Sequence, residues 1–242
     1  MDGKWAVVFD FDGTLIPKSY GSLYDVIDSN GGVTAECHER AKEMRKYYLA
    51  LAHAGKLTKK HQEKWLVDSL NIYISSGLTV PRIREILSGV SLRPGVKECL
   101  LELRVRNVPV AVVSYGVFQF IDSVLRSNGV RNLVRRVYSA NLETDDSGAV
   151  NGFSENTFVF PFNKGKCSRD FADNCDVSYR NILAVGDSPS GDRQLGYLKE
   201  NRLGIAGDKM EKERLLSVMG SVAVTETFQP ATRWLLGKID GR

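Results

Sequence analysis

Two aspartates end an apolar run near the start of the sequence. The stretch VVFDFDGTLI (7–16) places Asp10 and Asp12 two residues apart, directly before Gly13. Ionised carboxylates repel each other and resist losing water, so a buried strand that delivers both to one place needs a partner for their charge. In an extended chain the two side chains project to the same side. The pair therefore indicates a site for a cation or for proton transfer.

Two later apolar runs also end in polar residues. The run VPVAVV leads into Ser114, Tyr115 and Gly116, and the run NILAV leads into GDSPSGD, which holds Asp187 and Asp192. The carboxyl ends of parallel strands meet at one edge of a sheet, where ligands bind. We therefore expect these side chains to converge with the first pair.

Carboxylates gathered in this way need a cation, and hard oxygen ligands favour Mg²⁺. The expected ligands are Asp10, Asp12, Asp187 and Asp192. Either Lys164 or Lys166 supplies a nearby ammonium, and N–H groups at a helix start beside Ser114 supply donors. Such groups stabilise the negative charge of phosphate oxygens, so the set indicates transfer of a phosphoryl group.

The nucleophile is expected to be an aspartate. The histidines stand at positions 38, 53 and 61, away from these segments. An ionised aspartate can attack phosphorus and form an aspartyl phosphate that water later cleaves. Asp10 suits this role, and Asp12 could protonate the leaving oxygen and then activate water.

The elements that must position these residues alternate between strand and helix after residue 94. Expected strands cover 5–9, 108–113, 133–139, 181–185, 202–205 and 221–224, with a hairpin at 145–148 whose returning strand lies near 157–160. Expected helices cover 96–105, 118–128, 166–174, 192–198 and 230–236. This alternation predicts an α/β fold with a doubly wound, Rossmann-like parallel sheet.

A helical insertion separates the first strand from the others. Stretches 34–54 and 58–74 have helical periodicity. The expected organisation is a core domain of residues 1–17 and 92–242 and a helical cap domain of residues 18–91. The cap should lie over the site, because it leaves the sheet directly after the first motif. Its aromatic side chains at 20, 24, 65 and 73 are expected to face a core more than a ligand.

The motifs DFDGT, VVSYG, a lysine after FN, and GDSPSGD occur in the order that is typical of one family. Across nearly the whole chain they resemble the haloacid dehalogenase superfamily of phosphatases. The resemblance implies Asp10 as nucleophile and Asp12 as acid and base. It also implies that Ser114 and Lys164 hold the phosphate, and that Asp187 and Asp192 complete the magnesium site.

The cap resembles those of the phosphoserine phosphatase-like and cytosolic 5′-nucleotidase branches. TAEC followed by KYY, and the stretch FVFPFNK, are similar to the nucleotidases and select Lys164 over Lys166. Tyr115 replaces a small residue of those enzymes and, with Gly116, is expected to line the substrate site. LALA (49–52) stands where they carry an acidic residue that helps to recognise the base.

Composition limits the other classes of function. The net charge of +4 is mild and interspersed, and basic clusters such as 40–46 have helical spacing, so nucleic acid is an unlikely partner. The short apolar runs predict no membrane span, and residues 1–4 do not resemble a signal peptide. The four cysteines show no metal-ligand spacing. We expect a cytoplasmic enzyme with reduced thiols.

The sequence predicts a Mg²⁺-dependent hydrolase of a small organic phosphate, with nucleoside 5′-monophosphates as candidates. Two alternatives stay open: a phosphotransferase or mutase of the same superfamily, and a binding module that has lost catalysis. Dehalogenation is disfavoured, because a dehalogenase needs no magnesium ligands and this chain keeps Asp12 and Asp187.

Overall fold

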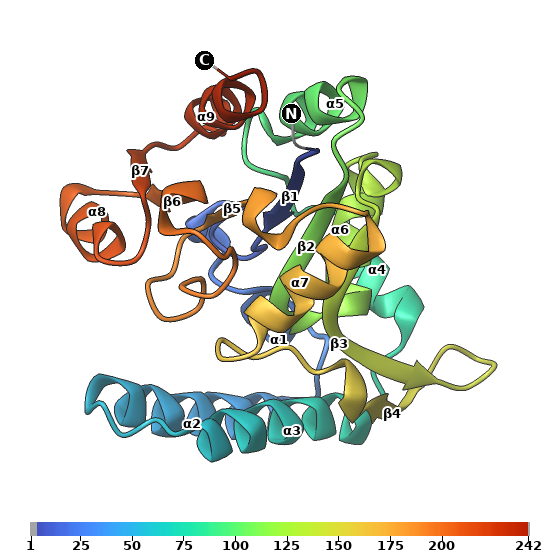
Figure 1. Ribbon diagram of the computed structural model, residues 1–242. Coiled ribbons are helices and arrows are strands. Elements are labelled where there is room, and N and C mark those ends of the chain that lie inside the picture. The colour runs from blue at the N-terminus through green and yellow to red at the C-terminus, as the bar shows by residue number, and fades with distance from the viewer. Residues whose placement is uncertain (1–3, 242) are drawn as a thin grey trace.

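A seven-stranded sheet runs through the computed structural model, which describes residues 4–241 (Figure 1). Residues 1–3, which belong to the predicted core domain, and residue 242 lie outside the described residues. The strand order is β4-β3-β2-β1-β5-β6-β7; β3 and β4 pair antiparallel, and the other neighbours pair parallel. The strands are β1 (Ala6–Phe9), β2 (Val110–Val117), β3 (Arg136–Thr144), β4 (Val150–Ser154), β5 (Ile182–Gly186), β6 (Arg202–Ala206) and β7 (Ser221–Val224).

Strand β1 lies at the centre of the sheet because both of its faces are apolar. Val7 and Phe9 enter one hydrophobic cluster, whereas Ala6 and Val8 enter another on the opposite face. All four residues are fully buried, as expected for a parallel strand that is covered on both sides. The predicted doubly wound α/β fold is confirmed.

Helices cover both faces of this sheet. Helices α5, α6 and α9 pack on the face of Val7 and Phe9, and α7 packs on the other. The helices are α1 (Leu23–Ser29), α2 (Ala35–His53), α3 (Lys59–Ser75), α4 (Val80–Leu87), α5 (Val96–Val105), α6 (Phe118–Ser127), α7 (Lys164–Asn174), α8 (Lys209–Leu216) and α9 (Gln229–Ile239).

The segment between β1 and α5 is helical, as predicted. Helices α1 to α4 each begin after a Ser or Thr whose side chain accepts an N–H of the first turn, namely Ser22, Thr34, Thr58 and Thr79. Helices α2 and α3 form a separate layer beyond the sheet, whereas α4 packs against α6 of the core (Figure 1). The boundary of the cap domain at residues 18–91 stays a prediction.

The returning strand of the hairpin lies earlier than predicted. It is β4, not residues 157–160, because Thr144 at the end of β3 pairs directly with the first residue of β4. Residues 157–160 have left the sheet by then. The Thr157 hydroxyl accepts the N–H of Asn141 at 2.9 Å, so a side chain replaces the strand partner there.

The predicted helix at 192–198 is also wrong. Residues 192–198 form turns and bends, because the Asp192 carboxylate turns back to accept N–H groups that precede it. Gly196 packs tightly on β5, where a Cβ would lie 3.1 Å from that of Ala184. Helix α8 was not predicted.

Candidate active site

Asp10 lies directly after β1, where the chain leaves the sheet. Its N–H donates to the Val185 carbonyl at 3.0 Å, which keeps the residue at the shared end of β1 and β5. The following loop turns at Gly13, whose φ of +71° is in the left-handed region that favours glycine. A Cβ on Gly13 would lie 2.3 Å from Asp187 Oδ2. The loop and Asp187 therefore meet where only glycine fits.

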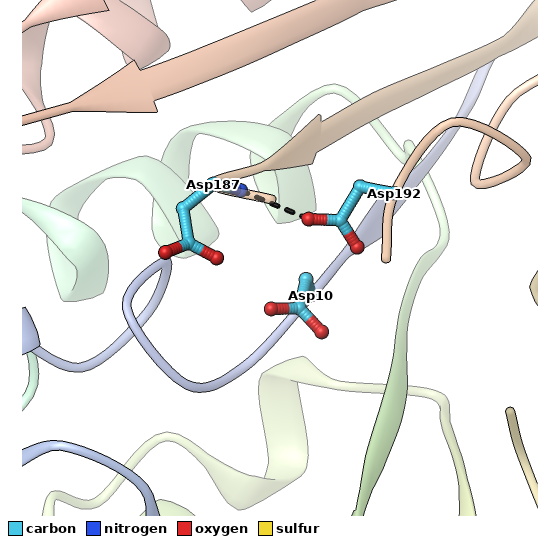
Figure 2. A group of neighbouring side chains, drawn as sticks. All are labelled: Asp10, Asp187 and Asp192. Carbon is cyan, nitrogen blue, oxygen red and sulfur yellow. Dashed lines mark hydrogen bonds between the residues drawn. The ribbon is translucent and has the colours of Figure 1, made fainter. Parts of the chain in front are cut away.

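Three of the predicted metal ligands converge at this point. Figure 2 shows the carboxylates of Asp10, Asp187 and Asp192 facing one another, with one oxygen of each within 4.8 Å of the others. Asp192 is fully buried, and its Oδ2 accepts the N–H groups of Asp187 at 3.0 Å and Ser188 at 2.9 Å. These two N–H groups fix the carboxylate that the loop after β5 brings back to the sheet edge.

The ammonium of Lys164 joins this cluster from the first residue of α7. Its Nζ donates to Asp10 Oδ1 at 2.6 Å and to Asp192 Oδ1 at 2.7 Å, and the side chain is buried. Lys166 is exposed. The structure thus brings Lys164, and not Lys166, to the carboxylates.

Asp12 lies on a different side of the site. Its Oδ1 accepts the N–H of Leu23 at 3.3 Å, at the start of α1, and its side chain lines a cavity beneath the inserted helices. It is not part of the group of three carboxylates. Its position agrees with a role in proton transfer, and its assignment as a metal ligand stays a prediction.

Burial sets the electrostatics of these groups. It raises the pKa of Asp10 well above its usual range, with repulsion from Asp192 and Asp187 adding to an effect that Lys164 only partly offsets. Burial likewise raises the pKa of Asp12 to about 7 and that of Asp187 to about 6. Burial lowers the pKa of Lys164, but its contacts with Asp10 and Asp192 raise it more, so the lysine stays charged.

The acidic cluster fits a divalent cation. Lys18, from the segment after the first motif, lies 3.2 Å from Asp187. Lys18 is shared with Glu211 at 2.8 Å, so Lys18 and Lys164 together do not balance the three carboxylates. Hard oxygen donors at this spacing suit Mg²⁺, which would relieve the repulsion that raises the carboxylate pKa values.

Ser114 lies in an irregular part of β2, not at a helix start as expected. Along the pair of strands, Val113 and Val117 of β2 face Tyr138 and Ala140 of β3, so β2 carries two extra residues between these points. Bulges of this kind redirect side chains beside active sites. The buried Ser114 hydroxyl accepts the N–H of its neighbour two residues on at 3.0 Å.

Tyr115 connects the bulge to the inserted helices. Its hydroxyl donates to the Gln62 carbonyl of α3 at 2.9 Å, and its own carbonyl accepts from the Tyr24 hydroxyl of α1 at 3.3 Å. Its ring lines the same cavity as Asp12. Tyr115 is therefore a wall of the site and a link between core and cap.

The cavity has a volume of about 170 Å³ and lies between the strand ends and helices α1, α2 and α3. Tyr24, Trp65 and Tyr73 line it. Tyr73 belongs to the hydrophobic core and Tyr24 packs against it, as the sequence predicts, and both rings also border the cavity. Sequence reasoning missed two charged lining residues, Asp28 and Arg45. Arg45 belongs to the basic cluster 40–46, and only its partial burial distinguishes it from the exposed lysines beside it.

Sequence reasoning also missed Arg93, which carries no motif. Its buried guanidinium donates to the carbonyls of Gly13 at 2.7 Å, Thr14 at 3.1 Å and Thr225 at 3.2 Å, and its N–H donates to Leu15 at 2.8 Å. These bonds hold the loop that carries the first motif.

The sequence matches the pyrimidine 5′-nucleotidase (UMPH-1) family over residues 8–206. The chain belongs to this family. Among curated proteins it is 22% identical to a 7-methylguanosine phosphate-specific 5′-nucleotidase of Homo sapiens, over 86% of this chain and 75% of that protein. It is 25% identical to a Xenopus laevis protein described as form A of that enzyme, over 86% of this chain and 78% of that protein.

Solved structures agree with this family on the fold. Cytosolic 5′-nucleotidase IIIB bound to cytidine superposes with a TM-score of 0.77 at 18% identity, over 98% of this chain and 86% of that one. A phospho-aspartyl intermediate analogue of phosphoserine phosphatase superposes with a TM-score of 0.67 at 19% identity, over 96% and 99%. The predicted resemblance to haloacid dehalogenase phosphatases of the 5′-nucleotidase branch is confirmed. Within residues 4–241, no helix is long and apolar enough to cross a membrane.

Proposed function

We propose that this chain hydrolyses phosphate monoesters of small alcohols with Mg²⁺, through a phosphoaspartyl intermediate on Asp10. The observation that carries the proposal is the contact of the buried Lys164 ammonium with Asp10 at 2.6 Å, inside a group of three carboxylates. Family membership supports the reaction class, and the names of relatives make nucleoside 5′-monophosphates the first substrates to test.

In the first step a carboxylate oxygen of Asp10 attacks phosphorus, and the bond between phosphorus and the alcohol oxygen breaks. Asp12 gives its proton to that oxygen, a role that suits a buried acid whose pKa burial raises to about 7. In the second step Asp12 takes a proton from water, which attacks phosphorus and frees Asp10 and inorganic phosphate.

Lys164, Ser114, Tyr115 and Gly116 are proposed to contact the substrate. An ammonium has three hydrogens, and Lys164 uses two on Asp10 and Asp192, which leaves one for a phosphate oxygen. The Ser114 hydroxyl and the N–H groups of the β2 bulge are the other phosphate donors. Mg²⁺, held by Asp10, Asp12, Asp187 and Asp192, would neutralise phosphate charge when bound.

Residues 18–91 are proposed to act as a cap that selects the substrate and excludes water from the site. We place the enzyme in the cytoplasm, because its four cysteines are free thiols and a reducing compartment keeps thiols in that form.

The test compares wild type and Asp10→Asn on 4-nitrophenyl phosphate and a panel of nucleoside monophosphates, with and without Mg²⁺. Asp176→Asn is the matched control, since Asp176 is exposed and its φ of +54° suits asparagine. Loss of turnover in Asp10→Asn alone supports the nucleophile. Turnover that survives in Asp10→Asn refutes it, and alcohol phosphorylation in the presence of methanol would reveal transfer to acceptors other than water.

A further inference from the structure

Asp28 is a carboxylate in the cavity wall that the proposed reaction does not use. It is the penultimate residue of α1, and only 9% of its side chain is exposed. It shares the cavity with Asp12, the proposed acid, so a substrate placed for reaction would extend toward it.

The negative charge of Asp28 is only partly compensated within the protein, by Arg45 and by the charge of His38. Its Oδ1 accepts the Tyr73 hydroxyl at 3.1 Å, and the nearest guanidinium nitrogen of Arg45 stands 3.6 Å from Oδ2, beyond hydrogen-bond distance. Arg45 makes its closer ion pair with Asp25, which does not line the cavity. The carbonyl groups at the end of α1 also disfavour a negative charge there. A donor or cation from a ligand would complete this site.

Apart from Arg45, which pairs with Asp25, the remaining wall is suited to an organic cation. Tyr24, Trp65, Tyr73 and Tyr115 line the cavity, and Tyr24 and Tyr73 stack with ring centres 6.2 Å apart. Aromatic faces attract ammonium and cationic ring groups, and aromatic cages use this attraction to bind quaternary nitrogen. An apolar cavity of roughly 150 Å³ holds one benzene molecule, so the 170 Å³ here admits one ring or a small ammonium group.

We propose that Asp28, with the aromatic wall around it, binds a positively charged nitrogen on the alcohol portion of the substrate. The substrate is then a phosphate monoester of a small alcohol that carries a cationic nitrogen. This inference rests on the proposed function for the chemistry at Asp10 but makes its own claim about the leaving group.

The test uses two esters of nearly the same shape and different charge. Phosphocholine carries a quaternary nitrogen, and 3,3-dimethylbutyl phosphate has carbon in its place. We expect kcat/KM with Mg²⁺ to be at least ~10-fold higher for phosphocholine, since cation–π and carboxylate contacts act on the charged ester alone. UMP and CMP, whose bases are neutral, are expected to be poorer substrates than phosphocholine.

Asp28→Asn keeps the shape of the side chain and removes its charge, so the ratio of the two kcat/KM values should fall by the share of the carboxylate, while the aromatic wall keeps the rest. Asp68→Asn is the matched control, because Asp68 lies on α3 and pairs with Lys64 but does not line the cavity. The ratio should be unchanged in this control.

A second measurement does not depend on catalysis or on a variant. Calorimetry of wild type should show choline binding more tightly than 3,3-dimethylbutan-1-ol. If no ester is hydrolysed but choline is preferred, the proposed function fails and the inference about Asp28 stands. Equal kcat/KM for the two esters, a preference that Asp28→Asn leaves unchanged, or a higher kcat/KM for UMP or CMP would overturn the inference.

Discussion

Replacing Gly13 by alanine tests whether the loop after β1 is shaped to fit Asp187. Two separate costs are expected. Gly13 has a φ of +71°, and an L-residue in that conformation costs about 1–2 kcal/mol. The new Cβ would also meet Asp187 Oδ2 at 2.3 Å, where ordinary contact begins at 3.4 Å. The carboxylate must therefore move by about 1 Å.

Gly129→Ala separates these costs. Gly129 has nearly the same φ, +69°, but nothing lies within 4 Å of a Cβ built there. Both variants should be destabilised by the strained backbone conformation, by about 1–2 kcal/mol. For a chain of this size, that lowers Tm by roughly 2–8 °C. Displacement of a site group by 1 Å can cost about 100-fold in rate, and only Gly13→Ala should show this loss.

The assay is Tm by calorimetry together with kcat/KM for 4-nitrophenyl phosphate over a range of Mg²⁺ concentrations. Gly13→Ala should need more Mg²⁺ for half-maximal activity, because one of its proposed ligands has moved. If both variants lose the same activity and respond alike to Mg²⁺, the fit between Gly13 and Asp187 is irrelevant to the site, and the reasoning fails.

Two further predictions concern the inserted helices. Tyr115→Phe removes the hydrogen bond to Gln62, which is worth about 1 kcal/mol, so hydrogen exchange of α3 amides should become roughly fivefold faster. Tyr20→Phe is the control, because the Tyr20 hydroxyl bonds to Ser91 and not to α3. Burial raises the pKa of Asp28 to about 6, although the hydrogen bond from Tyr73 and the charge of His38 both lower it. Arg45 is the other charged group that faces this carboxylate. Because the folded state holds this proton more tightly, wild type should lose about 1–3 kcal/mol more stability than Asp28→Asn as pH rises from 4 to 6. The other buried carboxylates contribute alike to both proteins and cancel in this difference.

The outcomes that contradict these two predictions are specific. Unchanged exchange in α3, or the same change in Tyr20→Phe, would mean that Tyr115 does not hold the cap. The free energy of unfolding, measured in urea, is compared for wild type and Asp28→Asn from pH 4 to 7. A constant difference between the two proteins would mean that the charge of Asp28 is already compensated in the folded state.

The central sheet could be predicted because its sequence signal is local. Four consecutive apolar residues, as in β1, are typical of a parallel strand that is buried on both faces, and polar residues that follow such strands gather at one edge of the sheet. The pattern of strand ends is therefore enough to bring Asp10, Asp187 and Asp192 together. How the helices pack does not enter this inference.

The cavity could not be predicted, because its residues depend on tertiary packing. Arg45 lies in a basic run at helical spacing, and its partial burial follows from contact of α2 with Asp25 and Asp28 of α1. The bulge at Ser114 depends on the register between β2 and β3, which β2 alone does not encode. The predicted helix at 192–198 failed because Asp192 bonds to N–H groups behind it, and not to those of a following helix.

The bonds of Arg93 have a consequence for how this architecture can be rebuilt. The chain leaves the core at Gly13 to Leu15 and returns to it at Arg93, and hydrogen bonds join these two points directly. The segment between Pro17 and Ser91 could therefore be replaced by a different helical segment without loss of these hydrogen bonds. Such chimaeras would keep the loop of the first motif closed, and would need a donor in place of the Leu23 N–H that binds Asp12.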